Sequence, residues 1–254
     1  MDRRSRPNPA RAPGRPPRAR RSRAPAAKRV LLKLSGEGLG ESGYDPALIR
    51  PLAAEIAALA ASGVEVAIVV GGGNLVRGRN LPADFVDRTI ADAAGMLATI
   101  ANGLVLAGAL RRAGARARVL TAVAMPEVAE AFTADRAREL MAAGEILLLA
   151  GGTGRPYFTT DTAAVLRALE IGANVVLKAT TVDGVYDRNP MKDRSAKKFD
   201  RLTFDECLDR RLGVMDLTAF TLCREHGLPV VVFAIGPGAL ARAAAGEPVG
   251  TRIG

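Results

Sequence analysis

Several residue types are scarce in this chain of 254 residues, and each scarcity argues against a class of function. The single histidine, His226, disfavours a serine-type catalytic triad and a histidine-ligated metal centre. The two cysteines, Cys207 and Cys223, fit no metal-binding spacing and indicate a reducing compartment, so we expect a cytoplasmic protein. No Gly-Lys pair occurs, which excludes the Walker A phosphate loop.

Aromatic residues are also few. They make up 4% of the chain against 48% for all apolar residues, which predicts a core of Ala, Val, Leu and Ile. We find no apolar run that approaches transmembrane length, and therefore expect no membrane association. His226 stands before Gly227 and is expected to be a cation at the C-terminal end of a helix rather than a catalyst.

Positive charge is concentrated at the N-terminus. The net charge is +10, but residues 1–28 hold nine arginines and Lys28 against Asp2, which leaves a single net positive charge for the rest. This segment has six prolines and no apolar stretch. It predicts a disordered tail over 1–28, followed by one domain over 29–254. A contact of the tail with nucleic acid or an anionic surface is the alternative, although the near-neutral body makes nucleic acid the weaker expectation.

Strand-like and helix-like patterns alternate through the remaining chain. Strands are predicted at 30–34, 64–70, 117–120, 146–149, 175–178 and 230–233. Helices are predicted from 45 to 63, at 85–113 and 126–141, from 161, at 203–211 and 216–226, and briefly after 237. The stretch 181–201 is predicted to be an exposed flap, and the C-terminal segment could add an edge strand. Strands that are apolar throughout are typical of parallel sheets covered on both faces, so the predicted fold is a three-layer α/β/α sandwich with a mainly parallel central sheet.

Two glycine-rich turns follow the first two strands. Lys33 precedes one at Ser35-Gly36, and Arg77 follows the other at Gly71-Gly72-Gly73. Glycine lets the backbone approach an anion closely, and ligands of such sheets collect beyond the C-terminal strand ends. The pattern predicts a phosphate site. A G-x-G-x-x-G match at 38–43 does not indicate a dinucleotide site, because the next strand ends in glycine rather than in an acidic residue.

These motifs together resemble bacterial UMP kinase, a branch of the amino-acid kinase superfamily. The resemblance runs in order over roughly residues 29–253. The segments that carry it are 33–37, 71–78, 92–99, 152–161, 177–186 and 214–217. It implies ATP-dependent conversion of UMP to UDP in pyrimidine nucleotide synthesis by direct in-line transfer, Mg²⁺ accompanying ATP, a homohexamer, and GTP and UTP as nucleotide effectors.

The resemblance also implies residue roles. The ATP-binding residues would be Lys33, Leu34, Ser35, Gly36, Gly73, Arg77, Thr180, Tyr186 and Asn189. The UMP-binding residues would be Gly72, Asp92, Thr153, Gly154, Arg155, Pro156, Tyr157, Phe158, Thr159 and Thr160. The catalytic residues would be Lys33, Arg77 and Asp161.

The chemistry of the catalytic positions fits these roles. Phosphoryl transfer develops charge on phosphate oxygens, which the Lys33 ammonium and the Arg77 guanidinium can stabilise. Asp161 could either cap a helix or hold Lys33 in place, and the sequence leaves both open. Asp216 is expected to be a helix N-cap rather than part of the site. No general base is required, because the acceptor phosphate is already ionised, and Mg²⁺ would be held chiefly by phosphate oxygens and water rather than by protein ligands.

Three departures from the family pattern and three rival functions remain. The loop between Gly36 and Asp45 is short in a region that helps bind the GTP activator, alanines surround Asp92, and Asn189 stands where Asp is typical. The rivals are a kinase for a carboxylate, carbamate or other phosphate acceptor, a molybdenum-storage protein, and a nucleic-acid binder that acts through the arginine tail.

Overall fold

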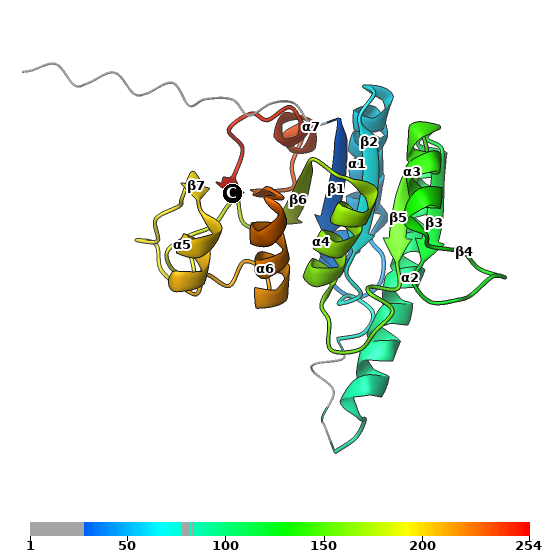
Figure 1. Ribbon diagram of the computed structural model, residues 1–254, viewed down its shortest axis with the longest axis horizontal. Coiled ribbons are helices and arrows are strands. Elements are labelled where there is room, and N and C mark those ends of the chain that lie inside the picture. Colours follow the sequence, from blue (N-terminus) through cyan, green and yellow to red (C-terminus); the bar gives the residue numbers. More distant parts are fainter. Residues whose placement is uncertain (1–27, 78–81, 83) are drawn as a thin grey trace, which may run out of the picture.

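The computed structural model describes residues 28–77, 82 and 84–254, and its middle layer is a nine-stranded sheet (Figure 1). The strands are β1 (Arg29–Leu34), β2 (Glu65–Val70), β3 (Ala117–Thr121), β4 (Glu130–Ala131), β5 (Ile146–Ala150), β6 (Val175–Thr180), β7 (Arg201–Leu202), β8 (Val230–Ala234) and β9 (Thr251–Ile253). Their order is β4-β3-β5-β2-β1-β6-β8-β9-β7. Among the described strands, every neighbouring pair is parallel except β8 with β9. The mainly parallel sheet is confirmed.

Helices cover both faces of the sheet (Figure 1). They are the 3₁₀ helix η1 (Gly36–Leu39) and the α-helices α1 (Pro46–Ala61), α2 (Arg88–Arg112), α3 (Ala134–Ala142), α4 (Thr160–Ile171), α5 (Phe204–Asp209), α6 (Leu217–His226) and α7 (Ala239–Ala244). One buried cluster joins the sheet to α1, α2 and α7, and a second joins it to α3, α4, α5 and α6. The predicted three-layer sandwich is therefore confirmed.

Alternation along the strands explains why both faces form a core. In β1, Val30 and Leu32 belong to the first cluster and Leu31 to the second, because successive side chains point to opposite faces. Each of these side chains is at most 1% exposed. An apolar strand with no polar face needs helices on both sides, as the sequence pattern indicated.

The predicted helix at 126–141 is wrong in its first half. Met125 forms a bridge with Ala129, β4 follows, and α3 begins only after Thr133. The Thr133 hydroxyl accepts a hydrogen bond from the Arg136 N–H and so caps α3. The Phe132 N–H donates to the Thr121 carbonyl, so the backbone before the cap pairs with β3 instead of continuing a helix.

The C-terminal strand also differs from the expectation. β9 does form, but it lies between β8 and β7, so β7 is the edge strand. The stretch 181–200 is largely exposed and irregular, as predicted for a flap, and a bridge between Tyr186 and Lys198 closes it on itself.

Helix α2 corrects the expectation about apolar runs. By length and composition alone it could cross a membrane. In the structure it packs against α1, β3 and β5, with Leu106 and Leu110 fully buried, so we interpret it as a core helix. The predicted disorder of residues 1–27 lies outside the described residues.

Candidate functional site

A cleft of about 880 Å³ opens where β1, β2, β5 and β6 end. Its walls come from the segments that follow these strands, from the first half of α2, and from the loop before α6. The lining residues are Lys33, Ser35, Glu37, Gly72, Gly73, Val76, Arg77, Arg88, Ala91, Asp92, Gly95, Met96, Thr99, Gly152, Thr153, Arg155, Phe158, Thr159, Thr160, Asp161, Lys178, Ala179, Thr180, Thr181, Gly213, Val214, Met215 and Asp216. The two glycine-rich turns therefore converge on one cavity, as predicted.

Two lysines and one aspartate form the centre of this cleft. Lys33 on β1 and Lys178 on β6 are register neighbours, and Asp161 in the first turn of α4 reaches between them. One carboxylate oxygen of Asp161 lies 2.8 Å from the Lys33 ammonium, and the other lies 2.7 Å from that of Lys178. The cluster carries two positive charges and one negative charge, so it presents one net positive charge to the cleft.

Burial and charge shift the pKa values of this cluster. Desolvation alone would raise the pKa of Asp161, but the charges of Lys33 and Lys178 outweigh it and hold that pKa below its ordinary value. Desolvation lowers the pKa of Lys178, and the charge of Lys33 adds to this, while Asp161 opposes both. The Asp161 carboxylate therefore offsets part of the positive charge that the two lysines bring into this largely buried cluster.

Asp161 does not cap its own helix. Thr159 is the N-cap of α4, and its hydroxyl accepts from the Asp161 and Thr162 N–H groups. Of the two roles that the sequence left open for Asp161, the structure supports the contact with Lys33. Capping by Thr159 leaves the Asp161 side chain directed toward the lysines.

Asp216 locks the starts of two helices together. It is the N-cap of α6, as predicted, and accepts from the Ala219 N–H at 2.9 Å. The expectation that it lies outside the site is wrong, because it also lines the cleft. It also accepts hydrogen bonds from the Thr159 and Thr162 hydroxyls on α4, at 2.5 and 2.8 Å. The N-terminal ends of α4 and α6 thus face the cleft side by side, and their partial positive charges favour an anion there.

The glycine turns are in direct contact with their surroundings. A Cβ atom on Gly36 would lie 2.5 Å from the Asn74 side-chain oxygen, and one on Gly72 would lie 2.8 Å from both the Gly95 carbonyl and the Ala98 Cβ. No side chain fits at either position without displacement. The fully buried Asn102 donates to the Gly71 carbonyl at 2.6 Å and to the Asn74 oxygen at 2.7 Å, which fixes the turn on α2.

Arg77 is held at the mouth of the cleft. Its guanidinium forms an ion pair with Glu37 and donates from Nε to the Gly73 carbonyl at 3.0 Å. Its side chain is 46% exposed. The guanidinium is therefore close to both glycine turns, while a carboxylate occupies part of its donor fork.

Asp92 on α2 binds the loop that follows β5. Arg88 donates from Nε to both carboxylate oxygens at 2.8 Å, and the Tyr157 N–H donates to one of them at 2.8 Å. Tyr157 has a φ of 70°, a backbone conformation that residues other than glycine rarely adopt. The Arg88 guanidinium lies 5.6 Å from the centre of the Tyr157 ring. The carboxylate and Arg88 together hold the loop in this shape.

Comparisons with known proteins match this sequence and this fold. The model of the Amino acid kinase family matches residues 28–234. The chain belongs to the amino acid kinase family. It is 50% identical over 236 residues to the uridylate kinase of Pseudomonas aeruginosa, covering 91% of this chain and 96% of that protein, and 51% identical over 230 residues to that of Pseudomonas syringae pv. syringae, covering 89% and 94%.

Solved structures agree with these relatives. The UMP kinase from Bacillus anthracis superposes with a TM-score of 0.87 at 37% identity, covering 90% of this chain and 96% of that one. The UMP kinase from Ureaplasma parvum gives 0.84 at 34% identity, with coverage of 89% and 98%. These comparisons confirm the expected resemblance to bacterial UMP kinases.

The structure gathers most of the predicted site residues of this family member in the cleft. Twelve of the predicted binding residues line it, namely Lys33, Ser35, Gly72, Gly73, Arg77, Asp92, Thr153, Arg155, Phe158, Thr159, Thr160 and Thr180, as does the catalytic candidate Asp161. The buried Leu34 and Gly36, together with Gly154, Pro156 and Tyr157, belong to the same turns and loop but do not line it.

Two predicted ATP contacts lie apart, in the flap. The Tyr186 hydroxyl donates to Asp183 at 2.6 Å, and the Asn189 side chain accepts from the Met191 N–H at 2.9 Å. Neither residue lines the cleft. Their roles remain predictions.

Four residues that bear on the site were not assigned a role from the sequence. They are Lys178, Arg88, Glu37 and Asn102. Lys178, Glu37 and Asn102 act through partners distant in the chain, whereas Arg88 binds Asp92 one turn further along α2. Lys178 gave a signal in the sequence, since a lysine at a buried strand end is unusual.

Among the described residues, no group of three or more His, Cys, Asp and Glu side chains is placed to hold a metal ion. The carboxylates of the cleft are engaged by cations or hydrogen-bond donors, as Asp161, Glu37 and Asp92 show. This donor set fits a metal that arrives with a nucleotide better than one that is resident in the protein.

Proposed function

We propose that the chain is an ATP-dependent UMP kinase that forms UDP for pyrimidine nucleotide synthesis. The observation that carries this is the convergence of Lys33, Arg77 and Asp92 on one cleft, in a chain that is 50% identical to uridylate kinases over 236 residues. A cleft of about 880 Å³ is within the upper part of the range typical of ligand sites and suits two nucleotides bound end to end.

The geometry suits a transfer that depends on positioned charge. The Lys33 and Lys178 ammonium groups, with the helix starts at α4 and α6, would stabilise negative charge on the phosphoryl group as it passes between the nucleotides. Arg77 can present parallel N–H donors to phosphate oxygens once it leaves Glu37. An ionised UMP phosphate needs no base, so Asp161 would order the lysines rather than take a proton. Mg²⁺, bound chiefly by ATP oxygens and water, would neutralise further charge.

The two substrates would occupy opposite ends of the cleft. ATP would lie against 33–36, Gly73 and Arg77. Its base would lie near Thr180 at the end of β6 and near Tyr186 and Asn189 of the flap. UMP would lie against Gly72, Asp92 and the loop 153–160, with its ribose hydroxyls at the Asp92 carboxylate. Asp92 already binds Arg88 and the Tyr157 N–H, so UMP would share or displace these donors.

A coupled assay of ADP release with UMP, CMP, dUMP and small carboxylate acceptors tests the proposal. We expect UMP to be the preferred acceptor. Lys33→Ala should lower kcat by roughly 100-fold or more, which is the order found for the removal of single charge-stabilising groups. Asp92→Asn should act mainly on the KM for UMP. Lys192→Ala in the flap and Asp135→Asn, whose carboxylate is 95% exposed, are matched controls. Activity confined to a non-nucleotide acceptor would refute it, and co-purified molybdenum without activity would favour the storage alternative.

We also propose that copies of the chain associate through α2, within the homohexamer that the family resemblance implies. Ile90, Leu97 and Leu104 are 61%, 51% and 40% exposed and recur every seven residues, which places them on one side of the helix. Sedimentation of Leu97→Lys beside the wild type tests this, since a charge on a contact face should shift the protein to smaller species. Rates measured with and without GTP and UTP test the effector prediction, and a cytoplasmic location follows from the substrates.

A further inference from the structure

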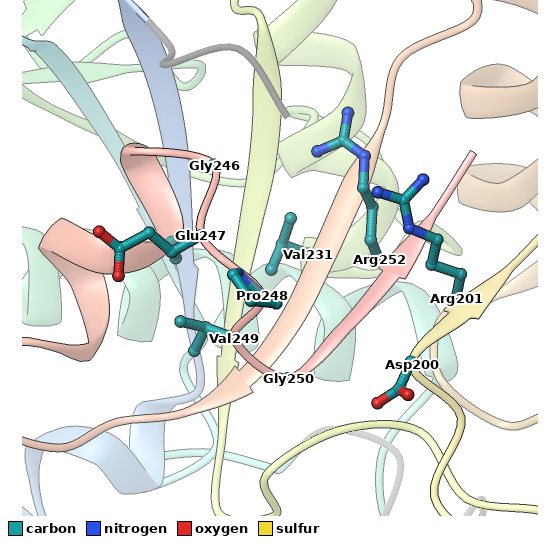
Figure 2. A pocket seen from close by; sticks show the side chains of 10 residues that line it. Asp200, Arg201, Val231, Gly246, Glu247, Pro248, Val249, Gly250 and Arg252 are labelled. Carbon is teal, nitrogen blue, oxygen red and sulfur yellow. The ribbon is translucent and has the colours of Figure 1, made fainter. Parts of the chain in front are cut away.

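A second cavity, of about 220 Å³, lies at the outer strands of the sheet and shares no residue with the nucleotide cleft (Figure 2). One wall is the turn that joins α7 to β9, and the other is formed by β8, β9 and β7. The lining residues are Asp200, Arg201, Val231, Ala243, Gly246, Glu247, Pro248, Val249, Gly250 and Arg252.

The register of the sheet places two arginines next to each other in this cavity. Arg252 on β9 is paired with Val231 on β8 and with Arg201 on β7. Paired residues of adjacent strands share a face, so these three side chains form one row. Val231 belongs to the core cluster beneath α7, and beyond it the row continues with two guanidinium groups instead of apolar side chains. Figure 2 shows both guanidinium groups extending in the same direction from neighbouring strands.

The acidic residues of the cavity are directed elsewhere. Asp200 directly precedes Arg201, and Figure 2 shows its carboxylate on the other side from the guanidinium groups. Glu247 lies 3.3 Å from Arg242 on α7. Within the described part of the chain, the Arg252 guanidinium makes no ion pair. Desolvation and the charge of Arg201 lower the pKa of Arg252.

The opposite wall packs directly against β8. The turn runs through Gly246 and Gly250, with φ of 71° and 64°, and a Cβ atom on Gly250 would lie 1.9 Å from the Val232 carbonyl oxygen. Like charges at paired strand positions destabilise a sheet, and an anion between them would reverse the sign of that interaction.

We propose that this cavity binds a phosphate-bearing anion between the guanidinium groups of Arg201 and Arg252. Guanidinium groups match phosphate oxygens with two parallel N–H donors each, which a point charge cannot do. The volume of about 220 Å³ suits one phosphate with little attached, either inorganic phosphate or the terminal group of a polyphosphate chain. The inference is independent of the function proposed for the nucleotide cleft.

Calorimetric titration of the full-length chain with inorganic phosphate, and separately with tripolyphosphate, tests the site. Because the nucleotide cleft also attracts phosphate, the titrations use a Lys33→Ala, Arg77→Ala background. We expect one phosphate per chain to bind there, and Arg252→Met or Arg201→Met, which retain the apolar stem, to weaken binding by at least about tenfold. Arg224→Met, at an exposed arginine that pairs with Asp205, should not change it. Tighter binding of tripolyphosphate would identify the ligand as a polyphosphate terminus, and equal binding as the free ion.

Thermal unfolding gives a second readout. In phosphate-free buffer of low ionic strength, Arg252→Met should unfold at the same or a higher temperature than the Arg224→Met control, because it removes a like-charge contact. Adding phosphate should raise the unfolding temperature of the background protein and leave that of its Arg252→Met derivative unchanged. Equal phosphate affinity with and without Arg252, absence of binding in the background, or a lower unfolding temperature for Arg252→Met would overturn the proposal.

Discussion

Replacement of Asp161 by Asn tests whether the carboxylate between Lys33 and Lys178 stabilises the protein as well as the site. The three side chains are 16%, 11% and 10% exposed, so the cluster is largely removed from water. Removing one partner of a buried ion pair costs about 3–5 kcal/mol. We expect Asp161→Asn to lower the free energy of unfolding by about 3 kcal/mol at pH 7, the lower end of this range, because the cleft is open to solvent on one side.

The pH dependence of this loss has a definite sign. The folded-state pKa of Asp161 is below its ordinary value, so its stabilisation is present above pH ~4 and is lost as the pH falls through the folded pKa. Asp161 also opposes the lowering of the Lys178 pKa, so in the variant that pKa falls further. A lysine with a lowered folded pKa makes the protein more stable as the pH rises toward about 10, because the unfolded state then binds more protons. The difference in the free energy of unfolding between wild type and Asp161→Asn should therefore be smaller at acid and at alkaline pH than at pH 7.

Urea unfolding followed by circular dichroism at about pH 3, 7 and 9.5 measures this difference in the free energy of unfolding, and suits a chain without tryptophan. Asp205→Asn, at an exposed carboxylate paired with Arg224, is the control and should stay within about 0.5 kcal/mol of wild type. A difference below about 1 kcal/mol at pH 7, or a difference that is the same at pH 7 and 9.5, would refute the reasoning.

Three further predictions follow from contacts around the cleft. Gly72→Ala should lower stability by about 1–3 kcal/mol through overpacking against Gly95 and Ala98. Gly108→Ala should raise stability by about 0.5–1 kcal/mol, because a Cβ atom there would meet no atom within 4 Å beyond its own stretch of helix; thermal unfolding compares the two variants. Asn102→Leu should cost about 1–3 kcal/mol for each polar group left unsatisfied at Gly71 and Asn74, measured by urea unfolding, and a neutral result would show that water replaces the amide. Glu37→Gln should release Arg77 and tighten ATP binding by no more than about fivefold in calorimetry, because the pair is 46% and 35% exposed; weaker binding would mean that Glu37 positions Arg77 rather than competing for it.

The order of strands and helices could be predicted because local patterns determine it. The strands near 30, 66, 147 and 176 are mostly apolar, apart from Lys33 and Lys178 near two strand ends. Asp45 with Pro46 marks the start of α1, where Asp45 accepts from the Ala47 N–H at 2.8 Å. The failure at 126–141 has a local cause as well. Thr133 can cap a helix, and that signal was outweighed by the helical spacing on either side of it.

The contacts of the site could be predicted only in part. Glycine turns at the ends of parallel strands must meet at one edge of the sheet, which brought Lys33 and Arg77 together correctly. The side chains that control them are set by packing between distant segments. Lys33 and Lys178 share Asp161 because β1 and β6 are neighbours in register, and Asn102 reaches Gly71 because α2 packs against the turn. Nothing in the local sequence of Lys178 or Asn102 records its partner.

The position of β9 has a consequence for the order of events during synthesis. β7 joins the sheet only through β9, yet α5, α6, β8 and α7 separate the two in the chain. When β7 leaves the ribosome, β9, the strand with which β7 pairs, has not yet been synthesised. The flap that precedes β7 can therefore dock on the sheet only after translation has passed α7. Pausing before β9 would prolong an intermediate in which the first seven strands of the sheet order can pair but β7 has no strand to pair with.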